Sequence, residues 1–293
     1  MPFVPRIALG LRGRHSRWMA AGDPWTIVEG GGPIVACAIH AGNEVRSEAL
    51  RHMAIRRRQR FVEEDPYTDQ LTAVAETRVV VHRSRFEVDL NRPRDRAVYR
   101  TPGDAWGLTV WRATLPAAVR QRSLRLHDRF FAELGGVLAR AGAGGRPFVV
   151  LDLHSYNHRR GGGGAPAADP AANPEINLGT GSLDRERWGG LVDRFSADLR
   201  TVDVGGRPLD VRENVRFRGG HLSRWVHATF PGQGCCLAVE VKKFFMDEHT
   251  GEVDESTWAG VHQALAATVP GLLDELETAR TVRRLRRRTA VSA

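Results

Sequence analysis

Cysteine is scarce in this 293-residue chain, and long apolar runs are absent from it. The three cysteines are Cys37, Cys235 and Cys236, and their odd number without a framework spacing predicts free thiols in a reducing compartment. No stretch reaches the roughly 18 uninterrupted apolar residues that a membrane-spanning helix needs. The N-terminal residues contain neither a continuous apolar region nor a small-residue cleavage site. We therefore expect a cytoplasmic protein with no membrane partner.

Lysine is also nearly absent, because it occurs only at Lys242 and Lys243, so arginine supplies most of the positive charge. Six arginines lie between residues 280 and 288, and without them the formal net charge falls from +9 to +3. This distribution predicts a single domain over residues 1–279 and a basic, disordered tail over residues 280–293. No helix-turn-helix, zinc-finger or aromatic stacking motif accompanies the arginines, so nucleic acid is not the expected partner. Binding of an acidic partner or a nucleic acid through the arginine-rich surface is kept as an alternative function.

Short apolar runs rich in valine and isoleucine alternate with segments of helical spacing. Buried strands are expected at residues 33–39, 78–82, 148–153 and 236–241. Helices are expected at residues 115–141, 188–199 and 257–279. This alternation predicts an α/β fold, with a mixed, mostly parallel central sheet covered by helices on both faces in three layers. In such sheets, polar residues at the C-terminal ends of strands form the ligand crevice.

Two glycine-containing segments are expected to be loops. Residues 159–172 read RRGGGGAPAADPAA, a composition that disfavours helix and strand and predicts a flexible insertion in the domain. Because this insertion follows the polar motif DLHSYN, it is interpreted either as a lid or as a passive loop. The second segment, 219–224, carries His221 and Arg224 behind two glycines.

Two histidines come directly after expected strands, His40 in AIHAGNE and His154 in DLHSYN. Both are therefore expected at the same rim of the sheet. Neutral imidazole is the commonest protein ligand of zinc, and catalytic zinc sites combine two or three histidines with a carboxylate. The pair predicts a metal site, and a capping or packing role is the alternative for either histidine alone. Asp152 lies two residues before His154 on the same strand face, where it could accept a hydrogen bond from the ring.

The third metal ligand is left open by the residues alone. Glu44 follows His40 by four positions. An acidic cluster in FVEEDPYTDQL is the other source of a carboxylate, and it contains Glu63, Glu64, Asp65 and Asp69. An isolated cluster of this kind is also typical of a solvated helix start.

Asn91 and Arg92 follow a strand-like alternation that begins at Arg85 and is stopped by Pro93. An arginine beside an amide at a crevice rim suits forked recognition of a carboxylate. The alternative is a surface ion pair between the arginine and a neighbouring aspartate.

Glu240 lies inside the apolar run 236–241, which is unusual because burying a lone carboxylate is costly. A carboxylate beside a metal site can take the proton of the attacking water and hand it on. The alternative is an ion pair with Lys242, which lies two residues further on the same face.

Six segments in this order resemble the N-formylglutamate amidohydrolase family, metal-dependent hydrolases related in fold to the zinc carboxypeptidases. They are HAG at His40, EEDPYTDQL, RFEVDLNRP, DLHSY, GGHLSRW and VEVKKFFMDE, and they extend from about Ile34 to Glu248. The first segment reads IHAG, where the better-known members carry a proline before the histidine and a serine after it. The resemblance implies a zinc-exopeptidase-like fold and a divergent branch of the family.

The resemblance also implies a metal centre. His40 and His154 would bind Zn²⁺ or another divalent metal. Asp65 is the first choice for the third ligand, because the family pattern carries an acidic residue there. Glu44 is its rival, because the carboxypeptidase pattern places a glutamate three residues after the first histidine, and here the gap is four.

The remaining implied roles concern the reaction and the substrate. Glu240 would act as general base and then as general acid, and Arg85 would polarise the carbonyl oxygen. Asn91 and Arg92 would anchor a substrate carboxylate, and His221 and Arg224 would line the pocket.

Together these features predict a zinc-dependent amidohydrolase that cleaves a C–N amide bond of a small acidic substrate. With N-formylglutamate the products would be formate and glutamate. The alternative hydrolase is a carboxypeptidase or amidase that acts on a short peptide with an acidic C-terminus.

Overall fold

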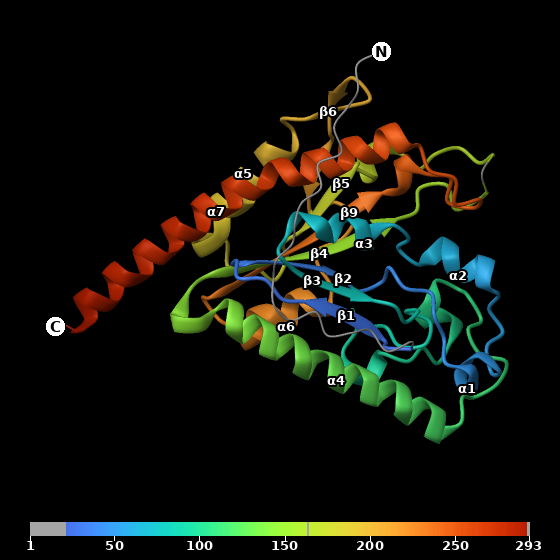
Figure 1. Cartoon of the computed structure of the whole chain (residues 1–293). Helices are drawn as coiled ribbons and strands as arrows, with labels where there is room; N and C mark the ends of the chain where they lie inside the picture. The colour runs from blue at the N-terminus through green and yellow to red at the C-terminus, as the bar shows by residue number, and fades with distance from the viewer. Residues whose placement is uncertain (1–21, 163, 292–293) are drawn as a thin grey trace, which may run out of the picture.

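The computed structural model describes the backbone of residues 22–162 and 164–291, and the side chains of these ranges up to residue 282. A seven-stranded sheet forms its centre, with strand order β1-β3-β2-β4-β9-β5-β8, and β6 and β7 form a separate ribbon (Figure 1). The strands are β1 (Trp25–Val28), β2 (Ile34–Ala38), β3 (Thr77–Val81), β4 (Phe148–Tyr156), β5 (Ile176–Gly179), β6 (Asp203–Val204), β7 (Arg207–Pro208), β8 (Val211–Glu213) and β9 (Gly234–Lys242). The helices are α1 (Ser47–Leu50), α2 (Arg57–Glu63), α3 (Thr68–Leu71), α4 (Ala117–Ala141), α5 (Arg185–Leu199), α6 (His221–Thr229) and α7 (Glu255–Val291). The 3-10 turns are η1 (Thr72–Val74), η2 (Arg94–Arg96), η3 (Pro102–Ala105), η4 (Ala143–Gly145), η5 (Pro170–Ala172) and η6 (Lys243–Phe245).

The sheet is mixed and mostly parallel, as the sequence predicts. β3, β2, β4 and β9 run parallel to one another, and β5 pairs with β8 in the same way. Two pairs are antiparallel, β1 with β3 and β5 with β9. The parallel arrangement places the C-terminal ends of β2, β4 and β9 at one edge, where the candidate site lies.

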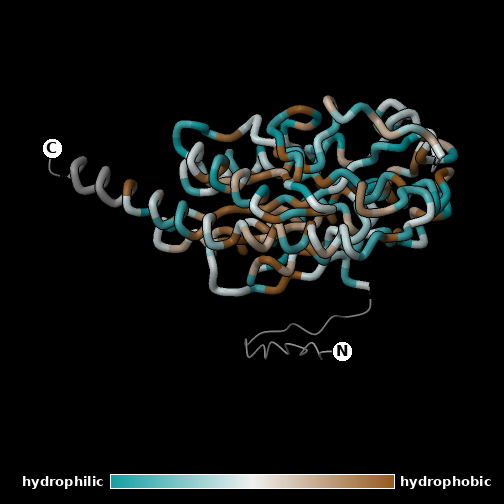
Figure 2. The backbone as a smooth tube through the Cα atoms, turned by 90° about the horizontal axis from the view of Figure 1, so that it is seen from above, coloured by the Kyte–Doolittle hydropathy of each residue, from teal (hydrophilic) through white to brown (hydrophobic). Residues whose placement is uncertain are grey.

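Helices cover both faces of the sheet and give the three expected layers (Figure 1). Alternate residues of β2 show the division, since Val35 and Cys37 join one core cluster whereas Ile34 and Ala36 join the other. The first cluster lies against α4 and α6, and the second lies against α5 and α7. The brown, apolar parts of the chain accordingly lie in its interior (Figure 2). Each fully buried large apolar side chain contributes about 1.5–3 kcal/mol to the stability of this core.

The expected helices and strands are present, with α4 and α5 close to the expected ranges and α7 beginning close to the expected residue. Two expectations for the backbone are wrong. The alternation from Arg85 to Arg92 is not a strand, because Ser84 and Asp89 accept hydrogen bonds from the backbone N–H groups of Phe86 and Asn91 and favour turns. The segment at 219–224 is not all loop: α6 begins at His221, because burial of Leu222 and Val226 on one face stabilises a helix.

The two remaining expected segments also have described structure. α7 continues to Val291 and so includes most of the tail for which disorder was expected. The glycine-rich insertion includes the 3-10 turn η5, and Asp169 caps this turn by accepting a hydrogen bond from Ala171 N. The division into one domain and a tail stays a prediction.

Other sequence expectations concern the cysteines and membranes. Cys37, Cys235 and Cys236 are all free and buried, and burial raises the pKa of each thiol. Over the described ranges, the helices are too short or too polar to cross a bilayer.

Candidate active site

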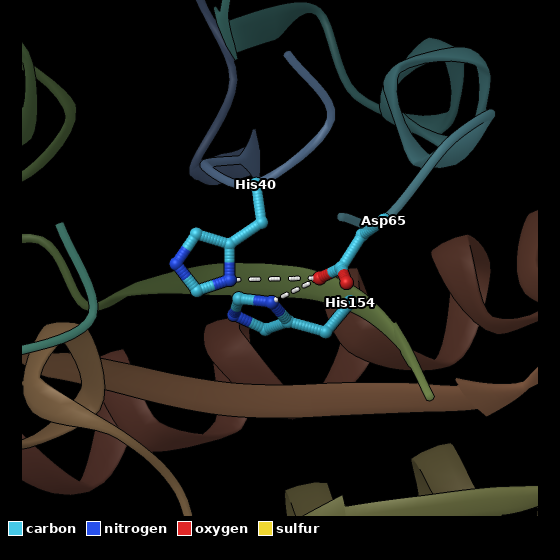
Figure 3. A group of neighbouring side chains, drawn as sticks. All are labelled: His40, Asp65 and His154. Atoms are coloured by element: carbon cyan, nitrogen blue, oxygen red, sulfur yellow. Dashed lines mark hydrogen bonds and ion pairs between the residues drawn. The ribbon is translucent and has the colours of Figure 1, made fainter. Parts of the chain in front are cut away.

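His40, Asp65 and His154 converge at the C-terminal edge of the sheet, and all three are buried (Figure 3). Asp65 Oδ2 lies 2.8 Å from His154 Nδ1 and 3.6 Å from His40 Nδ1. One ligand atom from each residue can be chosen so that all three lie within 4.8 Å of one another. Two imidazoles and one carboxylate are the donor set that catalytic zinc sites use.

The backbone explains this convergence. His40 lies two residues after β2, and His154 lies in β4, the parallel neighbour of β2. Asp65 follows α2, and its N–H donates to the carbonyl oxygen of His40 at 3.0 Å. Glu63, Glu64 and Asp65 therefore lie at and after the end of α2, and Asp65 folds back onto the strand edge, whereas Asp69 lies in the first turn of α3.

Each histidine has a second carboxylate on its other ring nitrogen. His40 Nε2 lies 2.7 Å from Asp89 Oδ1, and His154 Nε2 lies 2.8 Å from Asp152 Oδ1. These contacts turn both Nδ1 atoms toward Asp65, the arrangement that orients histidine ligands in metal sites. His40 Nδ1 is buried and has no hydrogen-bond partner in the structure. An unpaired buried acceptor beside a carboxylate fits a divalent cation.

The charges of the group support the same interpretation. Burial alone would raise the pKa of Asp65, but the hydrogen bond from His154 and the nearby imidazole of His40 hold that pKa far below its usual range. Burial would lower the pKa of His154, but the carboxylates of Asp152 and Glu240 raise it well above its usual value. The site therefore concentrates negative charge that a buried cation would balance.

Glu240 lies on β9 directly opposite His154 in the β4–β9 register, so both side chains lie on the same face. It borders the cavity that also contains His40 and Asp65. Burial raises the pKa of Glu240 to about 7, although His154 opposes this shift. Lys242 Nζ donates to Asn173 O at 3.0 Å, and no ion pair with Glu240 occurs over the described residues. A carboxyl group with this pKa can both accept and release a proton near neutral pH.

Arg85 and Asn91 also line the cavity, which has a volume of about 530 Å³. Arg85 Nη2 donates to Asp89 Oδ2 at 3.1 Å, and its guanidinium lies 4.8 Å from the centre of the Trp106 ring. Asn91 Nδ2 lies 3.3 Å from His154 Nε2, and Asn91 Oδ1 accepts from Leu222 N. Both residues are therefore held beside the candidate metal site.

Four other predicted site residues do not line this cavity: Glu44, Arg92, His221 and Arg224. The side chain of Glu44 is 53% exposed, and its Oε2 lies 3.4 Å from Arg83 Nη1. Arg92 Nε lies 3.4 Å from Asp89 Oδ2, and Arg92 Nη2 donates to Asp104 O. The ring of His221 packs against Phe131 and His127, and burial lowers its pKa to about 4.

Arg224 is exposed at the surface of α6 and donates to Gly219 O at 3.2 Å. Its guanidinium therefore braces the glycine turn that precedes the helix.

Sequence reasoning missed several residues of the cavity, among them Trp106, Asn157, Arg216, Phe217 and Lys243. Lys243 is buried, and its Nζ donates to Val62 O, Glu64 O and Asn157 Oδ1 at 2.7–2.9 Å. Burial lowers the pKa of this lysine to about 8. The chain has only two lysines, and this rarity was a signal that could have identified Lys243.

Asp89→Asn is expected to raise the dissociation constant for zinc by about 10–100-fold, because an amide orients and polarises the His40 ring less well than a carboxylate. Zinc titration of the purified variant measures this. Asp95→Asn, on the exposed part of the same segment, is the matched control and should bind zinc like the wild type. Unchanged zinc affinity in a folded Asp89→Asn protein would contradict the expected role.

Comparisons with known proteins identify a family and similar folds. A sequence model of the family described as N-formylglutamate amidohydrolase matches residues 32–245. No match is found among the curated proteins. A solved N-formylglutamate amidohydrolase from Ralstonia eutropha is similar with 21% identity and a TM-score of 0.65, over 89% of this chain and 98% of that one. A gene product of Agrobacterium tumefaciens is similar with 18% identity and a TM-score of 0.53, over 90% and 97% of the two chains.

Proposed function

The chain belongs to the N-formylglutamate amidohydrolase family, and from this premise we propose that it is a metal-dependent hydrolase of N-formylglutamate. Family membership makes it a hydrolase of amide bonds, and the metal and the substrate are the proposed part. The proposal rests on one observation. The side chains of His40, Asp65, His154 and Glu240 lie together at one edge of the sheet. The first three supply a metal donor set, and the fourth supplies a proton acceptor beside it.

His40, Asp65 and His154 would hold the metal, with Asp89 and Asp152 orienting the two rings. When bound, zinc at such a site polarises the substrate carbonyl and lowers the pKa of water toward ~7. Asp65 rather than Glu44 is proposed as the third ligand, because it is buried between the two histidines.

The chain's own groups carry out the proton transfers. Glu240 accepts the proton of the attacking water as the water oxygen bonds to the formyl carbon. It then donates that proton to the nitrogen of the leaving amine, so that the C–N bond breaks and formate and glutamate form. Its pKa of about 7 suits both steps. Arg85 donates toward the developing oxyanion, and a donor of this kind contributes about 10²–10³ in rate. Asn91 binds the substrate's α-carboxylate through its amide.

A formate-release assay tests this proposal. Zinc-loaded protein is expected to form formate and glutamate in equal amounts from N-formylglutamate. Dialysis against a chelator should abolish turnover, and added zinc should restore it. Full turnover after verified metal removal would contradict the metal dependence. Hydrolysis of acidic C-terminal peptides without hydrolysis of N-formylglutamate would favour the alternative peptide substrate.

A further inference from the structure

The segment between β8 and α6 forms the cavity wall that lies furthest along the sheet from Arg85. Arg85 follows β3, whereas this segment follows β8, and β2, β4, β9 and β5 lie between these two strands in the sheet. Arg216, Phe217 and Arg218 from the segment all border the cavity. Arginines from the segment between β8 and α6 therefore border the substrate space together with Arg85.

Asn177 fixes the backbone of this segment beside Glu240. It is fully buried on β5 and lies directly opposite Glu240 in the β5–β9 register. Its Oδ1 accepts from Arg216 N at 2.9 Å, and its Nδ2 donates to Phe217 O at 2.8 Å. Asn177, the cross-strand neighbour of the proposed proton acceptor Glu240, therefore holds the backbone of Arg216 in place.

The Arg216 guanidinium is held by aromatic rings and has no carboxylate partner in the described part of the chain. Its Cζ lies 5.5 Å from the centre of the Tyr156 ring and 5.4 Å from that of Phe217. Arg85 and Arg160, which also border the cavity, do pair with carboxylates, Arg85 with Asp89 at 3.1 Å and Arg160 with Glu63 at 2.8 Å, and Arg216 differs from its neighbour Arg218 in these aromatic contacts. Aromatic contacts position a guanidinium but leave its N–H donors free for a ligand.

Tyr156 relates Arg216 to the proposed site of bond cleavage. It lies two residues after His154 on β4, so the two side chains share a face and are separated by about 6.6 Å along the strand. A carboxylate joined to the scissile amide by a short aliphatic arm would reach across such a distance. The side chain of a glutamyl substrate has this form, and its uncharged counterpart is the glutaminyl side chain.

We infer that Arg216 is the residue that selects substrates with a side-chain carboxylate, which it binds through its free N–H groups. The inference rests on the proposed function and extends it, because Asn91 is proposed to bind the α-carboxylate and Arg216 would bind the second carboxylate of the substrate. Charge-assisted hydrogen bonds of this kind distinguish a carboxylate from an amide of the same shape.

The test compares N-formylglutamate with N-formylglutamine on the zinc-loaded, full-length protein. Arg216→Gln is expected to lower kcat/KM for N-formylglutamate about 10–100-fold, mainly by raising KM. For N-formylglutamine the change should stay within about twofold, so the preference for glutamate over glutamine is lost. Arg212→Gln is the matched control, because Arg212 pairs with Asp210 and does not border the cavity, and it should keep the preference.

Binding of glutamate and of glutamine, measured by calorimetry on the same three proteins, gives the comparison without turnover. Equal losses for both ligands in Arg216→Gln, or a glutamate preference that survives the substitution, would overturn the inference. A wild type that binds glutamate through Arg216 but hydrolyses no formyl amino acid would instead overturn the proposed function and leave the inference standing.

Discussion

Replacing Glu240 by glutamine is expected to lower kcat by about 10²–10⁴-fold while the protein still binds its metal. The amide has nearly the same shape as the carboxyl group, but it cannot accept the proton of the attacking water or deliver it to the leaving nitrogen. Glu240 is not one of the three clustered donors, so its loss leaves His40, Asp65 and His154 in place. Steady-state formate release and zinc content of the same preparation measure the two effects.

A matched control separates the loss of this base from the loss of negative charge in the cavity. Glu63 borders the same cavity, but its carboxylate pairs with Arg160 at 2.8 Å. Glu63→Gln should therefore retain most of the turnover. Glu240→Gln with wild-type kcat, or equal losses in both variants, would remove Glu240 from the proposed mechanism.

The strand positions could be predicted because their signal is local. β2, β4 and β9 are largely buried on both faces, so each begins with a run of apolar residues, and His40, His154 and Glu240 stand out at or near the strand ends. The parallel order of these strands then brings these residues to one edge without further information from the sequence.

The directions of side chains outside the strands could not be predicted in this way. Arg92 and Arg224 have the residue types of a carboxylate site, but turns and helix α6 direct them to Asp89 and Gly219 O. The burial of Asp65 likewise depends on Lys243, which is distant in sequence and binds the carbonyl oxygens of Val62 and Glu64. Contacts between residues so far apart in the sequence leave no periodic pattern in it.

The residues alone left the third ligand open between Asp65 and Glu44, and in the structure Asp65 is the carboxylate that lies beside both histidines. Asp65→Ala is expected to raise the dissociation constant for zinc by more than about 100-fold, because even the loss of an outer partner costs 10–100-fold. Turnover at limiting zinc should fall as zinc binding weakens. Glu44→Ala should bind zinc like the wild type, because that side chain lies at the surface beside Arg83.

Zinc titration of both variants, with thermal unfolding to verify that each is folded, decides between the two carboxylates. Asp65 lies between the two buried imidazoles, on the side of their Nδ1 atoms, whereas Asp89 and Asp152 lie beside the Nε2 atoms. Tight zinc binding by Asp65→Ala together with weak binding by Glu44→Ala would reverse the assignment. It would also require the segment after His40 to rearrange when metal binds, since Glu44 Oε2 now lies 3.4 Å from Arg83 Nη1, outside the cavity.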